Sequence, residues 1–437
     1  MSASSHRAPR DTGITTRSTA GHVDMPEISD RIVELDRAMR WGYGFALGPF
    51  ELWDALGVPE TVERMRADGC AIPGSVERML ASGAQSFYQN ADAAGHPGTR
   101  YFDLNSGSFA TLEDRPGVLV LDDIKRARGV VKSNRGASLV DLGDDVLCLE
   151  FHSKMNALGD DMVHMVTAAL DVVDRSFAAL VVANDGENFS VGANLLEVLH
   201  AAQEGRWEEL ETSVRRFQAA CMAMKYASRP VVSATFGLAL GGGCEVVLHA
   251  GRTVAAAETY MGLVETGVGL IPAGGGCKEM LLRLGSAKAA FELIGYGKVS
   301  ESALHARELG FLRACDAITI NRERLTADAK AAALSMAPSW SPGMPRQDIA
   351  VEGVAGFALL KMGMKLAQEG GYITEYDTVV GEKLAHVLCG GRLTGTQKVS
   401  EQYLLELERE AFLSLCGDQR TQERMQYMLK NGKALRN

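Results

Sequence analysis

The 437-residue sequence has no run of 18 consecutive apolar residues, so no transmembrane helix is predicted. Its first 24 residues lack the apolar segment of a secretory signal, and we expect residues 1–26 to be disordered. The eight cysteines form no Cys-x-x-Cys pair, which predicts reduced thiols in a cytoplasmic protein. The nine histidines show no repeated ligand spacing, and no metal site is expected.

Excess positive charge is also absent, because the formal net charge is −10 and the pI is near 5.5. This balance argues against nucleic acid as a partner, and any anionic ligand must be met by a local basic patch. The hydrophobic content of 46% and the charged content of 23% are ordinary for a globular enzyme with a large core. The length predicts about three domains.

The most informative motif is a strand, a glycine turn and a helix. Residues 229–235 have the β-branched pattern of a buried strand, Gly241–Gly243 follow, and residues 244–250 are expected to be helical. Consecutive glycines let a ligand approach backbone N–H groups at the positive end of a helix. A glycine run alone is more often a purely structural tight turn.

A second apolar run, residues 177–183, also has strand length and is followed by the turn Asn184-Asp185-Gly186 and then by Val191-Gly192-Ala193. If both strands are parallel and joined by helices, their turns lie at the same carboxyl edge of the sheet. Glu245 and Glu265 would bring two carboxylates to that edge, where one can act as a base and the other as an acid.

These motifs, in this order and at this spacing, resemble the enoyl-CoA hydratase (crotonase) family over about residues 138–320. The resemblance implies an α/β fold with a crotonase-like ββα spiral core. It implies an oxyanion hole made by the backbone N–H groups of Ala193 and Gly242. It also implies that Glu245 mainly activates water and that Glu265 mainly protonates C2 of the substrate.

The resemblance also implies a substrate site, with coenzyme A lying against the turn that contains Lys154 and Ala157. Lys154 is a candidate phosphate or adenine contact, with a simply solvated side chain as the alternative. Asn194 stands where many family members carry an acidic residue, and we expect it to cap a helix over residues 195–203. The predicted substrate-binding residues are Lys154, Ala157, Ala193, Asn194, Leu195, Leu196 and Gly242.

Residues 27–90 resemble the C-terminal helical domain of 3-hydroxyacyl-CoA dehydrogenases, and residues 382–405 are similar to the end of bifunctional enzymes that join that dehydrogenase to a crotonase domain. No Gly-x-Gly-x-x-Gly motif is found in residues 1–27, so we expect no NAD binding and no other cofactor. The expected domains are a disordered stretch 1–26, a helical domain 27–98, a linker 99–137, a crotonase-like domain 138–337 and a C-terminal helical domain 338–437.

Smaller segments give further expectations. Residues 117–121 are predicted to be a short strand, and the basic residues 125–128 a solvated helix face. Prolines between 338 and 345 mark a connection, after which helices are predicted near 350–369, 374–388 and 400–416. The last of these is expected to carry a core that includes Phe412.

The expected function is that of an enoyl-CoA hydratase, a hydro-lyase that adds water to 2-enoyl-CoA thioesters in fatty-acid β-oxidation or a related degradation. One alternative is an enoyl-CoA isomerase. Another is a hydratase subunit that docks a separate NAD-dependent 3-hydroxyacyl-CoA dehydrogenase chain. The expected partners are an acyl-CoA thioester, further copies of the chain in a homo-oligomer, and a dehydrogenase or thiolase chain, without nucleic acid or membrane.

Overall fold

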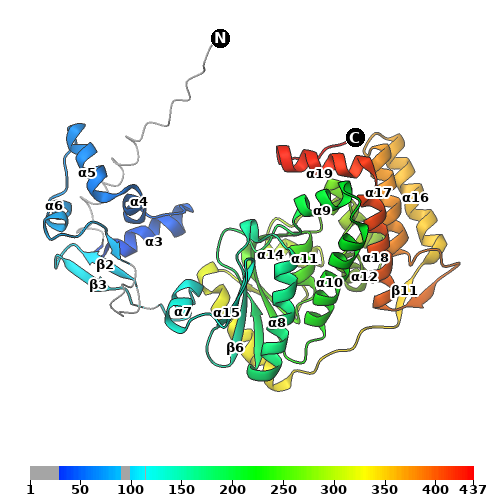
Figure 1. Ribbon diagram of the computed structural model, residues 1–437, viewed down its shortest axis with the longest axis horizontal. Helices are drawn as coiled ribbons and strands as arrows, with labels where there is room; N and C mark the ends of the chain where they lie inside the picture. The colour runs from blue at the N-terminus through cyan, green and yellow to red at the C-terminus, as the bar shows by residue number, and fades with distance from the viewer. Residues whose placement is uncertain (1–28, 90–98, 114) are drawn as a thin grey trace, which may run out of the picture. The chain divides into compact units, whose positions relative to one another are not determined.

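A computed structural model describes residues 29–89, 99–113 and 115–437 (Figure 1). The chain divides into two compact units, residues 1–116 and residues 117–437. The expected disorder of residues 1–26 lies outside the described residues. The division falls inside the segment 99–137 that was expected to be a linker.

The first unit joins short helices to a small antiparallel sheet in the order β1-β2-β3. Its core contains Phe50, Trp53 and Phe87, all at most 2% exposed. Pro49 at the first helical position starts α4, and Gly44 with φ 66° ends α3. The elements are α3 (Ile32–Tyr43), α4 (Pro49–Leu56), α5 (Val58–Ala67), α6 (Gly74–Ala81), β1 (Tyr88–Gln89), β2 (Arg100–Asp103) and β3 (Ser108–Thr111).

The second unit is built on a seven-stranded sheet in the order β10-β9-β8-β7-β6-β5-β4. The strands from β6 to β10 run parallel, whereas β4 and β5 are antiparallel to their neighbours. β7 is buried along its whole length, which explains why its sequence is a continuous run of apolar residues. The strands are β4 (Lys132–Ser133), β5 (Ala137–Asp141), β6 (Val146–Phe151), β7 (Ala179–Val182), β8 (Val231–Leu240), β9 (Arg252–Gly262) and β10 (Ala317–Thr319).

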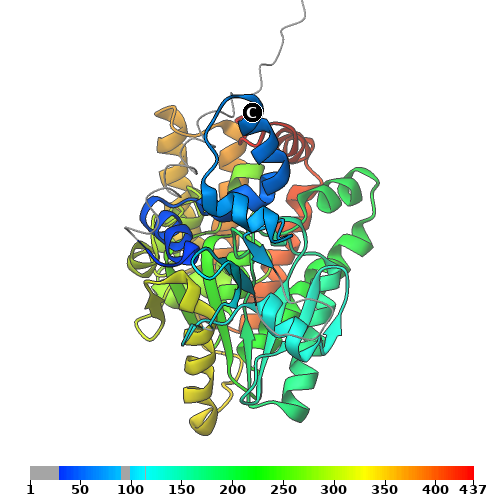
Figure 2. The same cartoon turned by 90° about the vertical axis from the view of Figure 1, so that its left-hand side faces the viewer.

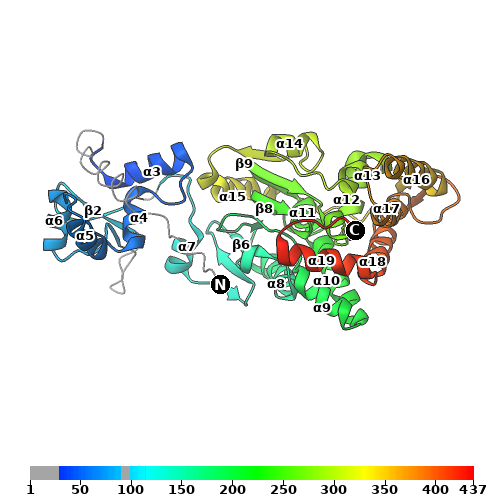
Figure 3. The same ribbon diagram turned by 90° about the horizontal axis from the view of Figure 1, so that it is seen from above.

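Helices cover both faces of this sheet, as the view in Figure 3 shows. α7 (Leu121–Arg128) and α15 (Leu325–Met336) pack on one face through Leu121, Leu325 and Ala329. The opposite face is covered by a larger core that includes α8, α10, α11 and α12. The helices on that side and around its edge are α8 (Asp160–Ser176), α9 (Leu195–Gln203), α10 (Trp207–Lys225), α11 (Gly242–Leu248), α12 (Gly276–Leu284), α13 (Ala287–Gly295) and α14 (Ala303–Glu308).

The C-terminal helices, orange to red in Figures 1 and 2, continue the same core. Within the described residues, no helix is both long enough and apolar enough to cross a membrane. Because the C-terminal helices share that core, residues 117–437 form one compact unit, in which the expected C-terminal helical domain is an extension of the sheet domain. Its elements are β11 (Ile349–Val351), α16 (Gly353–Glu369), α17 (Glu375–Leu388), β12 (Gln397–Val399), α18 (Glu401–Cys416) and α19 (Gln419–Asn431).

Residues 117–121 are not a strand, which corrects the sequence-based expectation. Leu121 is fully buried at the start of α7. Two acidic residues occupy the first turn of α7 and basic residues its last turn, which favours a helix through its dipole. Lys125 is not only solvated, because its ammonium donates to both oxygens of the buried Glu150 at 2.9 and 3.1 Å.

Candidate active site

The glycine run lies at the carboxyl end of β8, as the strand, turn and helix pattern predicts. Gly241 has φ 53°, a left-handed conformation that glycine adopts without strain, and α11 begins at Gly242. A Cβ on Gly243 would lie 2.6 Å from the carbonyl oxygen of Ser190. The two turns that follow β7 and β8 therefore meet closely only because this residue has no side chain.

The backbone N–H groups of Ala193 and Gly242 come together at this point. A Cβ built on Gly242 would lie 3.6 Å from the nitrogen of Ala193. Leu158 holds the Ala193 segment, because its nitrogen donates to Gly192 O at 2.8 Å and its carbonyl accepts from Asn194 N at 3.1 Å. In the described part of the chain, neither the Ala193 nor the Gly242 amide donates to another protein group. Both donors are thus free for a ligand oxygen.

Glu245 lies in the first turns of α11 and is 3% exposed. Its Oε1 accepts two hydrogen bonds, from the backbone nitrogens of Gly274 and Gly276, each at 2.7 Å. Burial raises the pKa of this carboxyl to about 7, and the two amide donors oppose that rise because they favour the ionised form. Oε2 accepts no hydrogen bond from the described residues and is left for water or substrate.

Glu265 begins the 3₁₀ turn η2 (Glu265–Val268), just after β9. Its Oε2 is buried without a hydrogen-bond partner among the described residues, and its Oε1 would lie 3.0 Å from a Cβ on Gly241. Burial and then the charge of Glu245 raise the pKa of this carboxyl to about 8. Two interacting buried carboxyls cannot both ionise easily, so near neutral pH the pair tends to share one proton.

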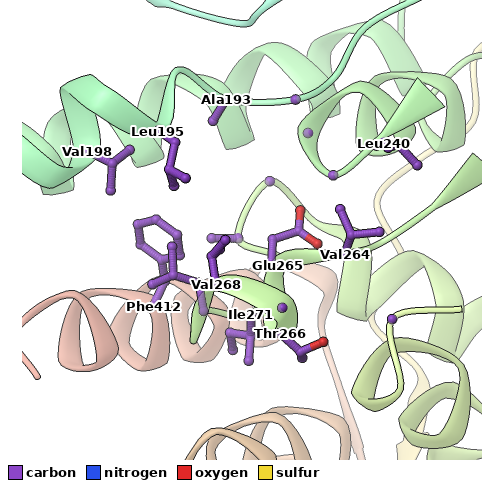
Figure 4. A pocket seen from close by; sticks show the side chains of 18 of the residues that line it. Ala193, Leu195, Val198, Leu240, Val264, Glu265, Thr266, Val268, Ile271 and Phe412 are labelled. Carbon is purple, nitrogen blue, oxygen red and sulfur yellow. The ribbon is translucent and has the colours of Figure 1, made fainter. Parts of the chain in front are cut away.

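A cavity of about 2010 Å³ surrounds both glutamates and both free amides. Figure 4 shows apolar side chains gathered on one side of Glu265: Leu195 and Val198 from α9, Val268, and Phe412 from α18. The volume of this cavity exceeds the range of about 300–1,000 Å³ that is usual for small-ligand sites.

The structure places most of the predicted substrate-binding residues around this cavity. Lys154, Ala157, Asn194 and Leu195 line it together with the two amide residues. Leu196 does not line it and is 46% exposed. Leu196 points about 100° around α9 from Leu195, and this direction leads to solvent and not to the cavity.

Asn194 is the N-cap residue of α9, but its side chain makes no hydrogen bond to the first backbone N–H groups. Its Nδ2 donates instead to Glu197 Oε1 at 2.7 Å. The expectation of a cap is therefore met by the position of Asn194 and not by its side chain.

Sequence reasoning missed several of the lining residues. The segment from Arg424 to Arg436 lines the cavity, although it is distant in sequence from the motifs. Phe217 also lines it, and it lies on α10, a helix whose residues were expected among the pocket walls. Arg135 lines it as well, and neither Arg135 nor Lys154 forms an ion pair with a described residue. Phe412 was expected as a core residue of its helix and not as a lining residue.

Two other groups of residues carry side chains that are reactive or metal-binding in other proteins. Burial raises the pKa of the Cys244 thiol well above its usual range, which disfavours a nucleophilic thiolate. Among the described residues, Asp122, Glu150 and Asp185 each have a carboxylate oxygen within 4.8 Å of the others, a spacing typical of ligands to one metal ion. The Lys125 ammonium lies against Asp122 at 2.7 Å and Glu150 at 2.9 Å, and this arrangement is that of an ion-pair cluster.

Comparison with known proteins agrees with this geometry. A sequence model of the family "Enoyl-CoA hydratase/isomerase" matches residues 143–318. A "Probable 3-hydroxyacyl-CoA dehydrogenase" of Bacillus subtilis (strain 168) is 43% identical over 420 residues, which is 94% of this chain and 52% of that protein. The mitochondrial methylglutaconyl-CoA hydratase of Rattus norvegicus is 29% identical over 196 residues, which is 44% of this chain and 58% of that protein.

The chain thus spans about half the length of these curated relatives. Among solved structures, an enoyl-CoA hydratase from Bacillus halodurans has a TM-score of 0.48 at 17% identity, covering 66% of this chain and 98% of that one. The family match contains Glu245, Glu265 and both free amides. The chain carries, over residues 143–318, a domain of the enoyl-CoA hydratase/isomerase (crotonase) family.

Proposed function

We propose that the chain is an enoyl-CoA hydratase that adds water to 2-enoyl-CoA thioesters, in fatty-acid β-oxidation or a related degradation. The observation that carries this proposal is the pairing of two buried carboxyls of raised pKa with two unpaired backbone N–H groups in one cavity. Hydration needs a base, an acid and a site for a developing enolate oxygen.

In the proposed reaction the thioester oxygen accepts hydrogen bonds from the amides of Ala193 and Gly242. Glu245 takes a proton from water as the water oxygen bonds to C3, and the electrons of the double bond move toward the thioester oxygen as an enolate. The enolate then takes a proton at C2 from Glu265. Each such donor to an oxyanion contributes about 3 to 4 kcal/mol to transition-state stabilisation in comparable acyl chemistry.

The environments of the two acids support this division of roles. Two backbone donors favour the ionised form of Glu245, which suits a base. Glu265 has a partnerless oxygen beside that charge, which favours its protonated form and suits an acid. After one turnover Glu245 holds the proton and Glu265 does not, and return of that proton restores the pair.

Two basic side chains in the cavity lining support the proposal that the substrate carries coenzyme A. Lys154 and Arg135 line the cavity without acidic partners, so both are available to phosphate groups. The overall charge of −10 makes such a local pair necessary. We expect the substrate phosphates at this part of the cavity and the acyl chain along the apolar residues near Glu265.

The test is to follow the loss of the 2-enoyl-CoA chromophore with wild type, Glu245→Gln and Glu265→Gln, over a series of acyl-chain lengths. Both variants are expected to lose at least 100-fold in kcat. Wild-type rates in both variants would show that this proton chemistry is wrong. Incubation with a 3-enoyl-CoA and analysis of the product separates hydratase from isomerase activity.

A second role, docking of a separate dehydrogenase chain, is favoured by one observation. The Bacillus subtilis relative named as a 3-hydroxyacyl-CoA dehydrogenase aligns with 94% of this chain, including the first unit. Co-purification of an NAD-binding chain from the native source would support this role. Full hydratase activity of the isolated protein, with no bound partner, would count against it.

A further inference from the structure

Glu408 on α18 is a carboxyl that the proposed reaction does not use, although it lies beside the residues that hold Glu245. It is fully buried. Its Oε2 accepts from Gly275 N at 2.8 Å, and its Oε1 accepts from Lys278 N at 2.7 Å. Both donors belong to the turn that starts α12.

The same turn supplies the amides that bind Glu245. Gly274 N and Gly276 N donate to Glu245, whereas Gly275 N, between them, donates to Glu408. Adjacent peptide planes share their backbone dihedrals, so a rotation that removed Gly275 N from Glu408 would also turn its neighbours. The two carboxyls therefore hold one short ribbon of backbone from opposite sides.

This turn has no spare room in which to adjust. A Cβ on Gly274 would lie 2.2 Å from Phe217, and one on Gly276 would lie 2.9 Å from Glu245 Oε1. A small displacement of the turn must therefore be transmitted to the Glu245 carboxyl.

Helix α18 is itself fixed against the turn. Glu401, seven residues before Glu408 and on the same face, accepts from the Lys278 ammonium at 2.9 Å. Gln218 on α10 links the two segments, because its Nε2 donates to both Ala273 O and Leu405 O at 2.8 Å. Glu408 is therefore held by a rigid support and lies outside the segment that matches the family.

We propose that Glu408 is a positioning residue for Glu245. Glu408 accepts hydrogen bonds from the Gly275 and Lys278 amides, and this fixes the direction in which the neighbouring Gly274 and Gly276 amides donate to Glu245. This inference rests on the proposed base role of Glu245. It means that the C-terminal helices are part of the catalytic apparatus, and that removing them would disable the base and not only open the cavity.

Several titratable groups face Glu245 and enter any measurement of its ionisation. They are Glu265, Glu408, the Lys278 ammonium and the thiols of Cys221, Cys244 and Cys277. Burial and then the charge of Glu245 raise the pKa of Glu408 well above its usual range. A substitution at Glu408 must therefore separate the loss of its hydrogen-bond geometry from the loss of a titratable carboxyl beside Glu245.

The variant Glu408→Asp keeps a titratable carboxyl with two oxygens but is one methylene shorter, so it cannot reach both amides in the present geometry. Glu408→Gln keeps the length but has one acceptor oxygen, and its NH₂ opposes an N–H. Both variants are expected to lower kcat about 10- to 100-fold with KM within threefold, because a misplacement of about 1 Å in a reacting group has that effect. The control is Glu150→Gln, because Glu150 is another buried carboxyl, which lies on β6 and is paired with Lys125 of α7. This variant should keep kcat within twofold.

A second readout does not depend on turnover. In protein labelled with ¹³C at the glutamate carboxyls, with the Glu245 signal assigned by Glu245→Gln, the titration midpoint of Glu245 is followed by NMR. Loss of the two amide donors disfavours the ionised form, so the midpoint should move to higher pH in Glu408→Asp. In Glu408→Gln the loss of a second titratable carboxyl beside Glu245 opposes that movement, so the Asp variant gives the clearer sign.

An unchanged Glu245 midpoint in Glu408→Asp would overturn the inference, even if kcat falls, because a merely structural role predicts that result. Wild-type kcat in either variant would overturn it too. If Glu408→Gln does not fold, the Asp variant alone decides. If the wild type hydrates no 2-enoyl-CoA, the proposed function fails, and the midpoint still tests whether Glu408 positions Glu245.

Discussion

Replacing Glu265 with glutamine is expected to stabilise the protein while it abolishes most of the activity. The Glu265 carboxyl is buried beside another carboxyl, and its Oε2 has no partner among the described residues. Glutamine has nearly the same shape and cannot ionise. Active sites often hold groups in states that the fold disfavours, and removing such a group relieves that cost.

The size of the effect follows from the pKa of Glu265, which rises from 4.5 to about 8 on folding. At pH 7 the unfolded chain ionises this group freely and the folded chain does not. This difference lowers the free energy of unfolding by about 3 kcal/mol at pH 7. For a carboxyl with a raised pKa, the contribution to stability is fully present below pH 4.5 and is lost as pH rises to about 8.

The assay is urea unfolding of wild type and Glu265→Gln between pH 5.5 and 8.5, together with kcat for hydration. The variant's advantage in unfolding free energy should grow with pH across this range, while kcat falls 100- to 10,000-fold. Glu292→Gln, a surface glutamate on α13 that also lines the cavity, is the control and should show no such trend. A variant that is less stable than wild type, or a difference independent of pH, would refute the assignment of a raised pKa to Glu265.

Three further outcomes are expected. Gly242→Ala should lower kcat about 10-fold or more, because the added Cβ would lie 3.6 Å from the Ala193 nitrogen and would crowd the space in which the two amides bind the enolate oxygen. Initial rates at saturating substrate measure this. Lys154→Ala and Arg135→Ala should each raise KM severalfold with kcat unchanged, and the effect should shrink at high salt, as a salt series of KM would show. A plot of kcat/KM against pH should be bell-shaped, with its limbs near pH 7 and pH 8 and not near pH 4.5, because a base must be ionised and an acid protonated.

The parts of the fold that could be predicted are those set by local pattern. The strand, glycine turn and helix around Gly241 follow from β-branched residues, a glycine run and the short, mostly apolar segment after it. The helix over residues 195–203 was predicted with its observed bounds. The strand predicted at 117–121 was wrong, because burial of Leu121 and the charge order of α7 outweigh a short apolar run.

The rest of the site depends on contacts that no local pattern contains. Phe412 and Glu408 reach the cavity and the α12 turn only because α18 packs against α10 and α12. In the sequence, Glu408 is one of several acids on a helix. Its burial is what makes it informative, and burial of an acid is not predicted by its hydropathy.

One lysine separates the buried acids of this region into two groups. Burial opposes ionisation of all of them, but the Lys278 ammonium contacts Glu279 and Glu401, and it lowers the pKa of Glu401 to about 2 and that of Glu279 below its usual range. Glu245 and Glu265 receive no such contact, and their pKa values rise.

Helix α18 contributes one acid of each kind, because Glu401 is ion-paired to the Lys278 side chain whereas Glu408 meets only backbone N–H groups, one of them from Lys278 itself. The Glu401–Lys278 ion pair fixes the position of the helix. Glu408, whose ionisation is disfavoured by burial, then holds the turn without adding a permanent charge next to Glu245. This arrangement explains why a helix outside the family domain can orient Glu245 and leave it able to exchange a proton near neutral pH.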